Sequence, residues 1–275
     1  MSKSREAVAM EAANKPERLP ASLRQARILA AFERSGFVSI TELAEEFGVS
    51  GMTVRRDLTA LDKRGLLART HGGAVPVGVQ AVIDSVEPAF DLRRRENADG
   101  KMAIARAAAG LIGPSESIGL DVGTSILALA EDIANRRDLR VFTNNLRVAM
   151  RLAEGNVTVY TLGGQVRSPE FSLIGPQAAE ALSGHFLDRV FIGVSGFDAN
   201  GFYDYSPEDT EIKRAFIAHA GSVVVLCDAS KFGRRALSRI VPLERVDLVV
   251  TDAAPPPDLA AALAAAGIET VIAGA

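Results

Sequence analysis

A cluster of polar and small residues near the middle of this 275-residue chain has the composition of an anion-binding loop. It begins at the end of the apolar segment 117–122 and comprises Asp121, Gly123, Thr124 and Ser125. A segment of helical periodicity follows, so these residues would lie at the first turn of a helix. Free amides and hydroxyls at that position can bind an anion, and the helix dipole favours negative charge there. A Gly-Thr pair after a strand is about as often a simple helix cap, and that alternative stays open.

Polar, glycine-rich segments follow further apolar segments in the same way. They are Thr143-Asn144-Asn145, Gly163-Gly164, Gly193–Gly196 and Asp228–Gly233. Lys231 and Lys213 add two positive charges, and together these groups suit a small phosphorylated ligand that also carries hydroxyls. Taken singly, Gly163-Gly164 is more typical of a turn, and Lys213 beside Glu211 is more typical of a surface ion pair.

Alternating strands and helices must position these clusters. The expected strands are 117–122, 140–143, 157–162, 189–195, 222–227, 247–251 and 270–272, and the expected helices 124–133, 145–153, 177–182, 210–220 and 258–265. Such alternation predicts an α/β domain with a mostly parallel sheet, in which ligands bind at the carboxyl ends of the strands. Neither a Walker loop nor a Gly-x-Gly-x-x-Gly motif occurs, so we expect no nucleotide cofactor.

The first 75 residues predict a different, smaller domain. A helix over 22–35 is followed by a capping box, Ser39-Ile40-Thr41-Glu42, which begins a short second helix that ends at Phe47. Ser50 then caps a third helix. Val54, Leu58 and Leu61 fall at i, i+4 and i+7 of that third helix and face a core. A strand at 66–70 and a turn at Gly72-Gly73 complete a winged helix-turn-helix.

The third helix exposes a polar, basic face that fits a major groove ~12 Å wide. Ser50 and Thr53 at its first turn can meet phosphates. Arg55 and Arg56 also lie outside the apolar stripe, although adjacent residues cannot point the same way. Two residues of the hairpin, Arg69 and His71, can touch an adjacent phosphate or a minor groove. The alternative is a small helical bundle with a solvated basic face.

This N-terminal segment resembles the DNA-binding domain of the DeoR family of bacterial transcriptional regulators over about 50 consecutive residues. The residues that carry the resemblance are Gly36-Phe37-Val38-Ser39, Glu42-Leu43-Ala44, Phe47-Gly48-Val49-Ser50, Thr53–Leu58, Leu61, Gly65-Leu66-Leu67, Arg69 and His71–Ala74. The resemblance implies that Ser50, Thr53 and Arg55 or Arg56 contact operator DNA. It also implies that Asp57 pairs with an arginine and does not contact a DNA base.

The remainder resembles the sensor domain of the same family. The matching residues are Phe90, Arg93, Asn97, Lys101, Asp121–Ser125, Thr143–Asn145, Gly163-Gly164, Ser172–Gly175, Asp188, Gly193, Gly196, Lys213-Arg214 and Asp228–Gly233. The resemblance implies a fold like that of ribose-5-phosphate isomerase relatives and a phosphorylated sugar or polyol as effector. It places nine residues in the effector pocket: Asp121, Gly123, Thr124, Ser125, Asn144, Gly163, Gly164, Lys213 and Lys231.

Two positions depart from the family pattern: Ser125 replaces the commoner threonine, and Asp209 stands where glutamate is usual. Within the family, segments such as 143–146 and 251–255 are most similar to the glycerol-3-phosphate regulators. Residues 204–209 depart from that subgroup.

The charge distribution agrees with two domains of different function. A net charge of −3 would by itself argue against nucleic-acid binding. However, residues 1–75 hold 12 Lys and Arg against 9 Asp and Glu, whereas residues 76–275 hold 19 against 25. We therefore expect a leader at 1–19, a winged helix-turn-helix at 20–75, a linker at 76–89 and a sensor domain at 90–275.

Composition excludes several other classes. Residues 1–20 mix both charges without an apolar core, and no apolar segment reaches the ~20 residues of a membrane span. We expect a cytoplasmic protein without membrane contact. The single cysteine, Cys227, rules out an internal disulfide, and with three scattered histidines it argues against a structural metal site.

These observations predict a DNA-binding transcriptional regulator, in particular a repressor of a carbohydrate or polyol catabolic operon, and not an enzyme. We expect a homo-oligomer, dimer or tetramer, because paired operator half-sites mirror protein symmetry. The alternative is a sugar-phosphate isomerase-like enzyme with a DNA-binding appendage, in which Asp121, Glu211 and Lys213 would transfer protons. A pure oligomerisation scaffold would leave the phosphate-like strand ends unexplained.

Overall fold

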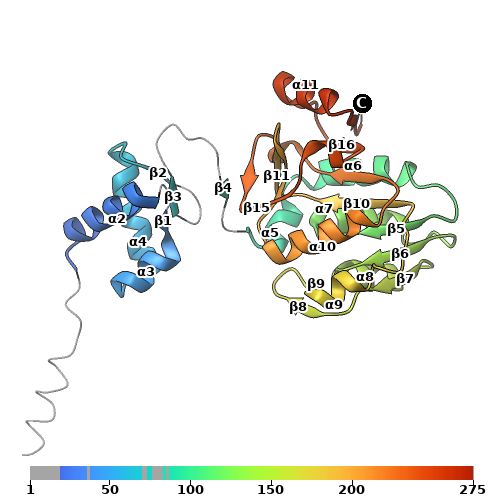
Figure 1. Cartoon of the computed structure of the whole chain (residues 1–275), viewed down its shortest axis with the longest axis horizontal. Coiled ribbons are helices and arrows are strands. Elements are labelled where there is room, and N and C mark those ends of the chain that lie inside the picture. The colour runs from blue at the N-terminus through green and yellow to red at the C-terminus, as the bar shows by residue number, and fades with distance from the viewer. Residues whose placement is uncertain (1–18, 36–37, 70–72, 76–82, 85–86, 275) are drawn as a thin grey trace, which may run out of the picture. The chain divides into compact units, whose positions relative to one another are not determined.

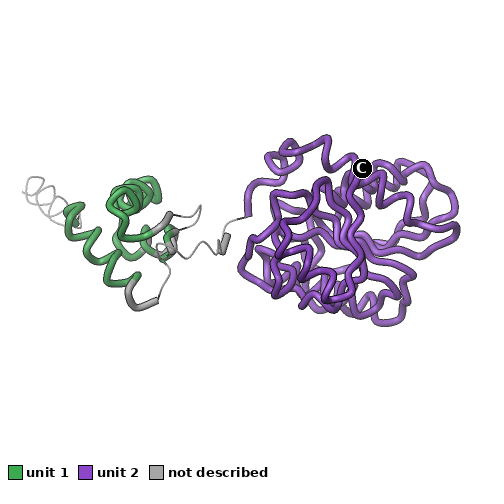
Figure 2. The backbone as a smooth tube through the Cα atoms, turned by 90° about the horizontal axis from the view of Figure 1, so that it is seen from above, with its two compact units in different colours: residues 1–80 green, residues 81–275 purple. Residues whose placement is uncertain are grey.

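The computed structural model describes residues 19–35, 38–69, 73–75, 83–84 and 87–274. The chain divides into two compact units, residues 1–80 and 81–275, which are called here the N-terminal and C-terminal units (Figure 2). The expected leader lies outside the described residues except for Leu19. The four domain boundaries expected from the sequence stay predictions.

The N-terminal unit is a winged helix-turn-helix, as expected (Figure 1). Strand β3 pairs antiparallel with both β1 and β2. This three-stranded sheet is the wing, and α4 is the third helix of the unit. In chain order the elements are α2 (Ala21–Ser35), β1 (Val38–Ser39), α3 (Ile40–Phe47), α4 (Gly51–Lys63), β2 (Ala68–Arg69) and β3 (Gly73–Val75).

Helix α4 begins where its sequence provides a cap. The amide of Thr53 donates to Oγ of Ser50 at 3.3 Å, which satisfies one of the free amides of the first turn. Val54, Leu58 and Leu61 are fully buried, as the i, i+4, i+7 spacing predicts, and belong to the core of this unit.

A buried ion pair joins α4 to α2. Nε of Arg24 donates to Oδ2 of Asp57 at 2.6 Å, and both side chains are less than a tenth exposed. Nε2 of Gln25 donates to the other carboxylate oxygen at 3.3 Å. Asp57 is therefore the partner of an arginine, as the sequence indicates, and it fixes α4 against the helix that precedes the motif.

The C-terminal unit contains a seven-stranded parallel sheet (Figure 1). The strand order is β17-β16-β13-β10-β5-β6-β7, and every neighbouring pair is parallel. The strands are β5 (Ser117–Leu120), β6 (Arg140–Thr143), β7 (Thr158–Thr161), β10 (Arg189–Gly193), β13 (Val223–Leu226), β16 (Leu248–Thr251) and β17 (Glu269–Ile272).

Helices cover both faces of this sheet. Successive side chains of a strand point to opposite faces, so Val190 and Ile192 of β10 pack in one apolar cluster and Phe191 in the other. One cluster includes side chains from α5 (Phe90–Arg95), α6 (Ala98–Gly110), α7 (Thr124–Ile133) and α8 (Leu146–Ala153). The other includes side chains from α9 (Pro176–Glu180), α10 (Pro207–Ala218) and α11 (Pro257–Ala265).

Several short strands were not expected from the sequence. The hairpin β8 (Gln165–Arg167) and β9 (Ser172–Ile174) follows β7. A small antiparallel sheet contains β11 (Gly196–Asp198), β12 (Gly201–Asp204) and β15 (Ser238–Val241). Inside the segment expected to be a linker, β4 (Ile83–Asp84) pairs parallel with β14 (Arg235–Ala236).

The chain order reverses in the middle of the sheet, between β5 and β10. From β5 the sheet grows through β6 and β7 on one side, and from β10 through β13, β16 and β17 on the other. In open parallel sheets this switch point leaves a crevice at the carboxyl ends of the strands.

Among the described residues, none of the helices combines the length and apolar composition that a membrane span requires.

Removal of the Asp57 carboxylate tests the ion pair between α2 and α4. We expect Asp57→Ala to lower the free energy of unfolding of the N-terminal unit by about 3 kcal/mol, because Arg24 would stay buried without its partner. Urea unfolding of the full chain, followed by amide exchange in α4, measures this. The control is Glu46→Gln on an exposed position of α3. Equal stability of the two variants would contradict the role of the pair.

Candidate functional site

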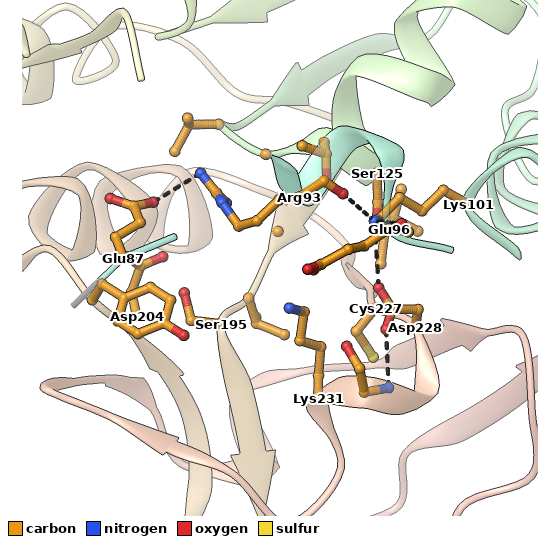
Figure 3. A pocket seen from close by; sticks show the side chains of 18 of the residues that line it. Glu87, Arg93, Glu96, Lys101, Ser125, Ser195, Asp204, Cys227, Asp228 and Lys231 are labelled. Atoms are coloured by element: carbon orange, nitrogen blue, oxygen red, sulfur yellow. Dashed lines mark hydrogen bonds and ion pairs between the residues drawn. The ribbon is translucent and has the colours of Figure 1, made fainter. Parts of the chain in front are cut away.

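A cavity of about 300 Å³ lies at the switch point of the sheet (Figure 3). Segments that follow β5, β10 and β13 form much of its wall. The ends of β5 and β10 approach closely, since a Cβ atom on Gly193 would lie 2.6 Å from the carbonyl oxygen of Val122. Its lining consists of Glu87, Arg93, Glu96, Asn97, Lys101, Val122–Ser125, Glu170, Gly193–Ser195, Asp204, Tyr205, Leu226–Asp228, Ser230 and Lys231.

Four of the nine residues predicted for the effector pocket line this cavity: Gly123, Thr124, Ser125 and Lys231. Thr124 and Ser125 are the first residues of α7 and are less than a tenth exposed. The N-cap residue of this helix is Gly123, which has no side chain to cap the first-turn amides. The start of α7 therefore has the amides, hydroxyls and dipole that suit an anion.

Lys231 supplies a positive charge to the same cavity. It ends the short 3₁₀ helix η1 (Ala229–Lys231), and its amine points into the cavity (Figure 3). Burial lowers the pKa of Lys231, and the neighbouring Asp228 opposes that shift. In the part of the chain that the structure describes, no carboxylate forms an ion pair with this amine. An anionic ligand would supply the missing counter-charge.

Lys213 and Asp121 lie beneath the cavity and not in its lining. Both are fully buried and form an ion pair with each other. Nζ of Lys213 also donates to the carbonyl oxygen of Gly193 at 2.9 Å and lies 3.2 Å from Oδ2 of Asp204. Burial lowers the pKa of Lys213, but Asp121 and Asp204 outweigh burial and raise it, so the amine stays charged.

This network fixes the cavity floor. Oδ2 of Asp121 accepts from the amide of Gly193 at 3.2 Å, which joins the end of β10 to the end of β5. Asp204 and Gly193 line the cavity and at the same time contact the buried amine. Lys213 and Asp121 therefore hold residues of the cavity lining in place, and their direct contact with effector stays a prediction.

Asn144, Gly163 and Gly164 lie outside the lining, so their place in effector binding also stays a prediction. Asn144 is fully buried, and both atoms of its side-chain amide lack a hydrogen-bond partner among the described residues. Gly164 has a left-handed φ of 111°, and a Cβ atom there would lie 2.4 Å from the carbonyl oxygen of Ile174. That glycine is required by the close approach of its backbone to β9.

A cluster of ion pairs on another wall was missed in the sequence. Nη2 of Arg93 lies 2.6 Å from Oε1 of Glu170 and 3.1 Å from Oε1 of Glu87, and all three residues line the cavity. Figure 3 shows the contact between Glu87 and Arg93. Glu87 also accepts from Arg167 at 2.9 Å. Arg167 in turn donates to Asp209, the position that departs from the family pattern.

Charge is unevenly compensated in this cluster. Burial and the neighbouring Glu170 raise the pKa of Glu87, whereas Arg93 and Arg167 lower it. Oε2 of Glu170 has no hydrogen-bond partner among the described residues, although the side chain is 1% exposed. A ligand hydroxyl can donate to such an oxygen, because a buried carboxylate requires donors. The only sequence signal for this cluster was the match of Arg93 to the family.

Lys101 anchors a third wall. It is buried, and its amine donates to the carbonyl oxygens of Arg93, at 2.6 Å, and of Glu96. It also lies 3.8 Å from Oδ2 of Asp228. Burial lowers the pKa of Lys101, whereas the neighbouring Asp228 acts to raise it.

Among the described residues, no group of three His, Cys, Asp or Glu side chains could hold a metal ion.

The structure describes five of the six residues predicted to bind DNA. Ser50 caps α4, and its Oγ lies 3.0 Å from Oγ1 of Thr53. Both Arg55 and Arg56 are exposed. Helical periodicity places Arg56 opposite the buried stripe and Arg55 beside it. Arg69 lies in β2 of the wing, and His71 lies outside the described residues.

Residues 24–77 match the DeoR-like helix-turn-helix domain, and residues 96–253 match the DeoR C terminal sensor domain. The chain belongs to the DeoR family of transcriptional regulators. The second match alone covers more than half of the chain. The expected resemblance of both domains to this family is therefore confirmed.

Named relatives cover most of this DeoR-family chain. The glycerol-3-phosphate regulon repressor of Escherichia coli strain K12 is 35% identical over 231 residues, or 83% of this chain and 90% of that one. The transcriptional repressor AccR of Agrobacterium fabrum is 34% identical over 232 residues, or 83% and 88%. Ribose 5-phosphate isomerase A from Methanocaldococcus jannaschii overlaps 50% of this chain and 55% of that chain, with 18% identity and a TM-score of 0.38. An overlap this partial adds nothing to the assignment of function.

The two lysines differ in their expected effects on stability. Lys213→Met should lower the free energy of unfolding of the C-terminal unit by about 3–5 kcal/mol, because Asp121 and Asp204 would stay buried without their cation. Lys231→Met should change this free energy by less than about 1 kcal/mol, because its amine forms no hydrogen bond or ion pair among the described residues. Urea unfolding of both variants measures the difference. Equal losses would contradict the assignment of Lys213 to the floor and Lys231 to the wall.

Adjacent glycines provide a matched pair of substitutions. Gly164→Ala should destabilise the C-terminal unit by about 2 kcal/mol or more, from backbone strain and overpacking against Ile174. Gly163→Ala should stay within about 0.5 kcal/mol, because a Cβ atom there meets no atom within 4 Å. Thermal unfolding of the two variants tests the pair. A destabilised Gly163→Ala variant together with an unaffected Gly164→Ala variant would contradict the claim that only Gly164 is required by its backbone conformation and close contact.

Proposed function

We propose that this DeoR-family protein represses a carbohydrate or polyol catabolic operon, and that a phosphorylated sugar or polyol in the cavity releases it from operator DNA. The observation that carries the proposal is the arrangement of Lys231 and the start of α7 at the switch point of the sheet. A positive side chain and first-turn amides suit a phosphate group, and the carboxylates of Glu87 and Glu170 in the same lining suit hydroxyls.

DNA binding is assigned to α4 and the wing. The exposed side chains of Arg55 and Arg56 are available for base edges or phosphates of a major groove, and Ser50 and Thr53 at the first turn for a phosphate. Arg69 and His71 of the wing would contact the neighbouring backbone or minor groove. A single winged helix rarely reaches operator specificity, so the protein would act in the cytoplasm as a dimer or tetramer on paired half-sites.

The relatives suggest where to begin the search for the effector. One of them is named for the glycerol-3-phosphate regulon, and glycerol 3-phosphate is therefore the first compound to test. The ligand must favour one arrangement of the protein over the other by a few kcal/mol to switch operator binding. An isomerase-like activity would require turnover of a phosphorylated sugar, and both relatives described above are named repressors.

The experiment is operator binding by fluorescence anisotropy, with the DNA upstream of the protein's own coding region. Binding should weaken as salt rises, because released counterions dominate such affinity. Arg56→Ala should weaken binding about tenfold or more, since one arginine contact to a base contributes about 1–3 kcal/mol. The control is Arg137→Ala, an exposed arginine of the C-terminal unit. Absence of operator binding at low salt would end the regulator proposal.

The effector half of the proposal is tested by a panel of phosphorylated sugars together with glycerol 3-phosphate. One member should raise the melting temperature of the wild-type chain and lower its operator affinity. Lys231→Met should lose both responses and keep operator binding. Turnover of a panel member at an ordinary enzymatic rate would favour the isomerase-like alternative instead.

A further inference from the structure

The charged side chains that line the cavity are not balanced. Among the described residues of this lining, five carry carboxylates: Glu87, Glu96, Glu170, Asp204 and Asp228. Three carry cations: Arg93, Lys101 and Lys231. The ion pair of Lys213 with Asp121 beneath the cavity adds one charge of each sign and leaves this excess unchanged. A ligand that is negative at both ends would therefore meet a lining that already holds more carboxylates than cations.

Three of these five carboxylates have a lysine or solvent to compensate them. Oδ2 of Asp204 lies 3.2 Å from the amine of Lys213, and Oδ2 of Asp228 lies 3.8 Å from the amine of Lys101. Glu96 is exposed, so solvent screens its charge. The excess of negative charge therefore falls on the remaining two carboxylates.

These two residues, Glu87 and Glu170, are called here the acidic pair, and they share one guanidinium. Nη2 of Arg93 lies 3.1 Å from the carboxylate of Glu87 and 2.6 Å from that of Glu170. Arg167 lies 2.9 Å from Glu87, but it is itself shared with the buried carboxylate of Asp209. Three carboxylates thus share two guanidiniums, and one negative charge has no matching cation among the described residues.

Oxygen atoms without partners indicate what the acidic pair lacks. Neither carboxylate oxygen of Glu170 has a hydrogen-bond partner among the described residues, although the side chain is 1% exposed. Burial raises the pKa of Glu87, and the charge of Glu170 adds to that effect. A buried carboxylate requires hydrogen-bond donors. A ligand hydroxyl is such a donor, whereas a ligand carboxylate brings only acceptors and one more negative charge.

The side of the cavity formed by the start of α7 has the opposite preference. Lys231 brings a positive amine, and Thr124 and Ser125 bring first-turn amides and hydroxyls. Glu87 and Ser125 lie on opposite sides of the cavity (Figure 3). A phosphate group bound at Lys231 and the start of α7 would therefore leave the other end of its ligand to face the acidic pair.

We propose that the acidic pair makes this cavity selective for phosphate esters whose other end carries hydroxyl groups, and that it excludes phosphorylated carboxylic acids. This inference rests on the proposed effector site and names the property by which that site chooses among phosphorylated compounds. A ligand carboxylate beside Glu87 and Glu170 is repelled at short range, where little solvent screens the charges. It also leaves the oxygens of Glu170 without a donor.

Isothermal titration calorimetry on the full chain tests the inference. Each sugar or polyol phosphate is compared with a phosphorylated acid of the same carbon skeleton: glycerol 3-phosphate with 3-phosphoglycerate, ribose 5-phosphate with 5-phosphoribonate, and glucose 6-phosphate with 6-phosphogluconate. For the skeleton that binds most tightly, the sugar or polyol phosphate should bind about 100-fold more tightly than its acid, because like charges brought together out of water repel strongly.

Two variants connect this ratio of affinities to the acidic pair. Glu170→Gln and Glu87→Gln should each reduce the ratio about tenfold, the effect expected when one charged partner is neutralised. Thermal unfolding first establishes that each variant is folded, and either folded variant is sufficient for the test. The matched control is Glu154→Gln, which removes a carboxylate whose side chain is 73% exposed and should leave the ratio unchanged.

A wild-type chain that binds the acid as tightly as the sugar or polyol phosphate would overturn the selectivity and leave the proposed effector site standing. Folded variants that keep the wild-type ratio would show that the acidic pair does not set it, and would also overturn the inference. Absence of binding by all of these compounds would count against the effector site itself, and the inference would fall with it.

Discussion

Lys213 carries a charged amine beneath the cavity at the switch point, with no exposure to solvent, and much of the site depends on how that charge is compensated. Asp121 comes from the end of β5, the carbonyl of Gly193 from the end of β10, and Asp204 from β12. One amine therefore holds together three segments that meet at the switch point of the sheet. Loss of any partner would leave a charge in a medium where uncompensated charge is strongly unfavourable.

The walls of the cavity are built in a different way, because their charges are only partly satisfied by the protein. The amine of Lys231 points into the cavity, Oε2 of Glu170 lacks a donor among the described residues, and Arg93 is shared by two carboxylates. Charged groups that are fully paired beneath the cavity and only partly paired in its lining suit a site that must bind a polar ligand and respond to it. The same division separates Lys213, which is fully buried in an ion pair, from Lys231, which lines the cavity.

The pattern of apolar and polar residues along the sequence was sufficient to predict much of the architecture. The strands of the parallel sheet were predicted within about two residues of their ends, because each is a short apolar segment bounded by polar or glycine-rich residues. The winged helix and the role of Asp57 were predicted as well. Strands β4, β8 and β14 were missed because each has only two or three residues and no alternation. The ion pairs of Glu87 were missed because its partner Arg167 lies 80 residues away in the chain, and one sequence does not show which distant charges meet.

We expect the phosphate group of an effector to bind between Lys231 and the start of α7, above the buried amine of Lys213. A crystal structure of the full chain with the panel member that weakens operator binding tests it most directly. Phosphate oxygens should lie within hydrogen-bond distance of Nζ of Lys231 and of the amides or hydroxyls of Thr124 and Ser125. A phosphate bound elsewhere, for example at Gly163-Gly164, with this cavity empty, would contradict it.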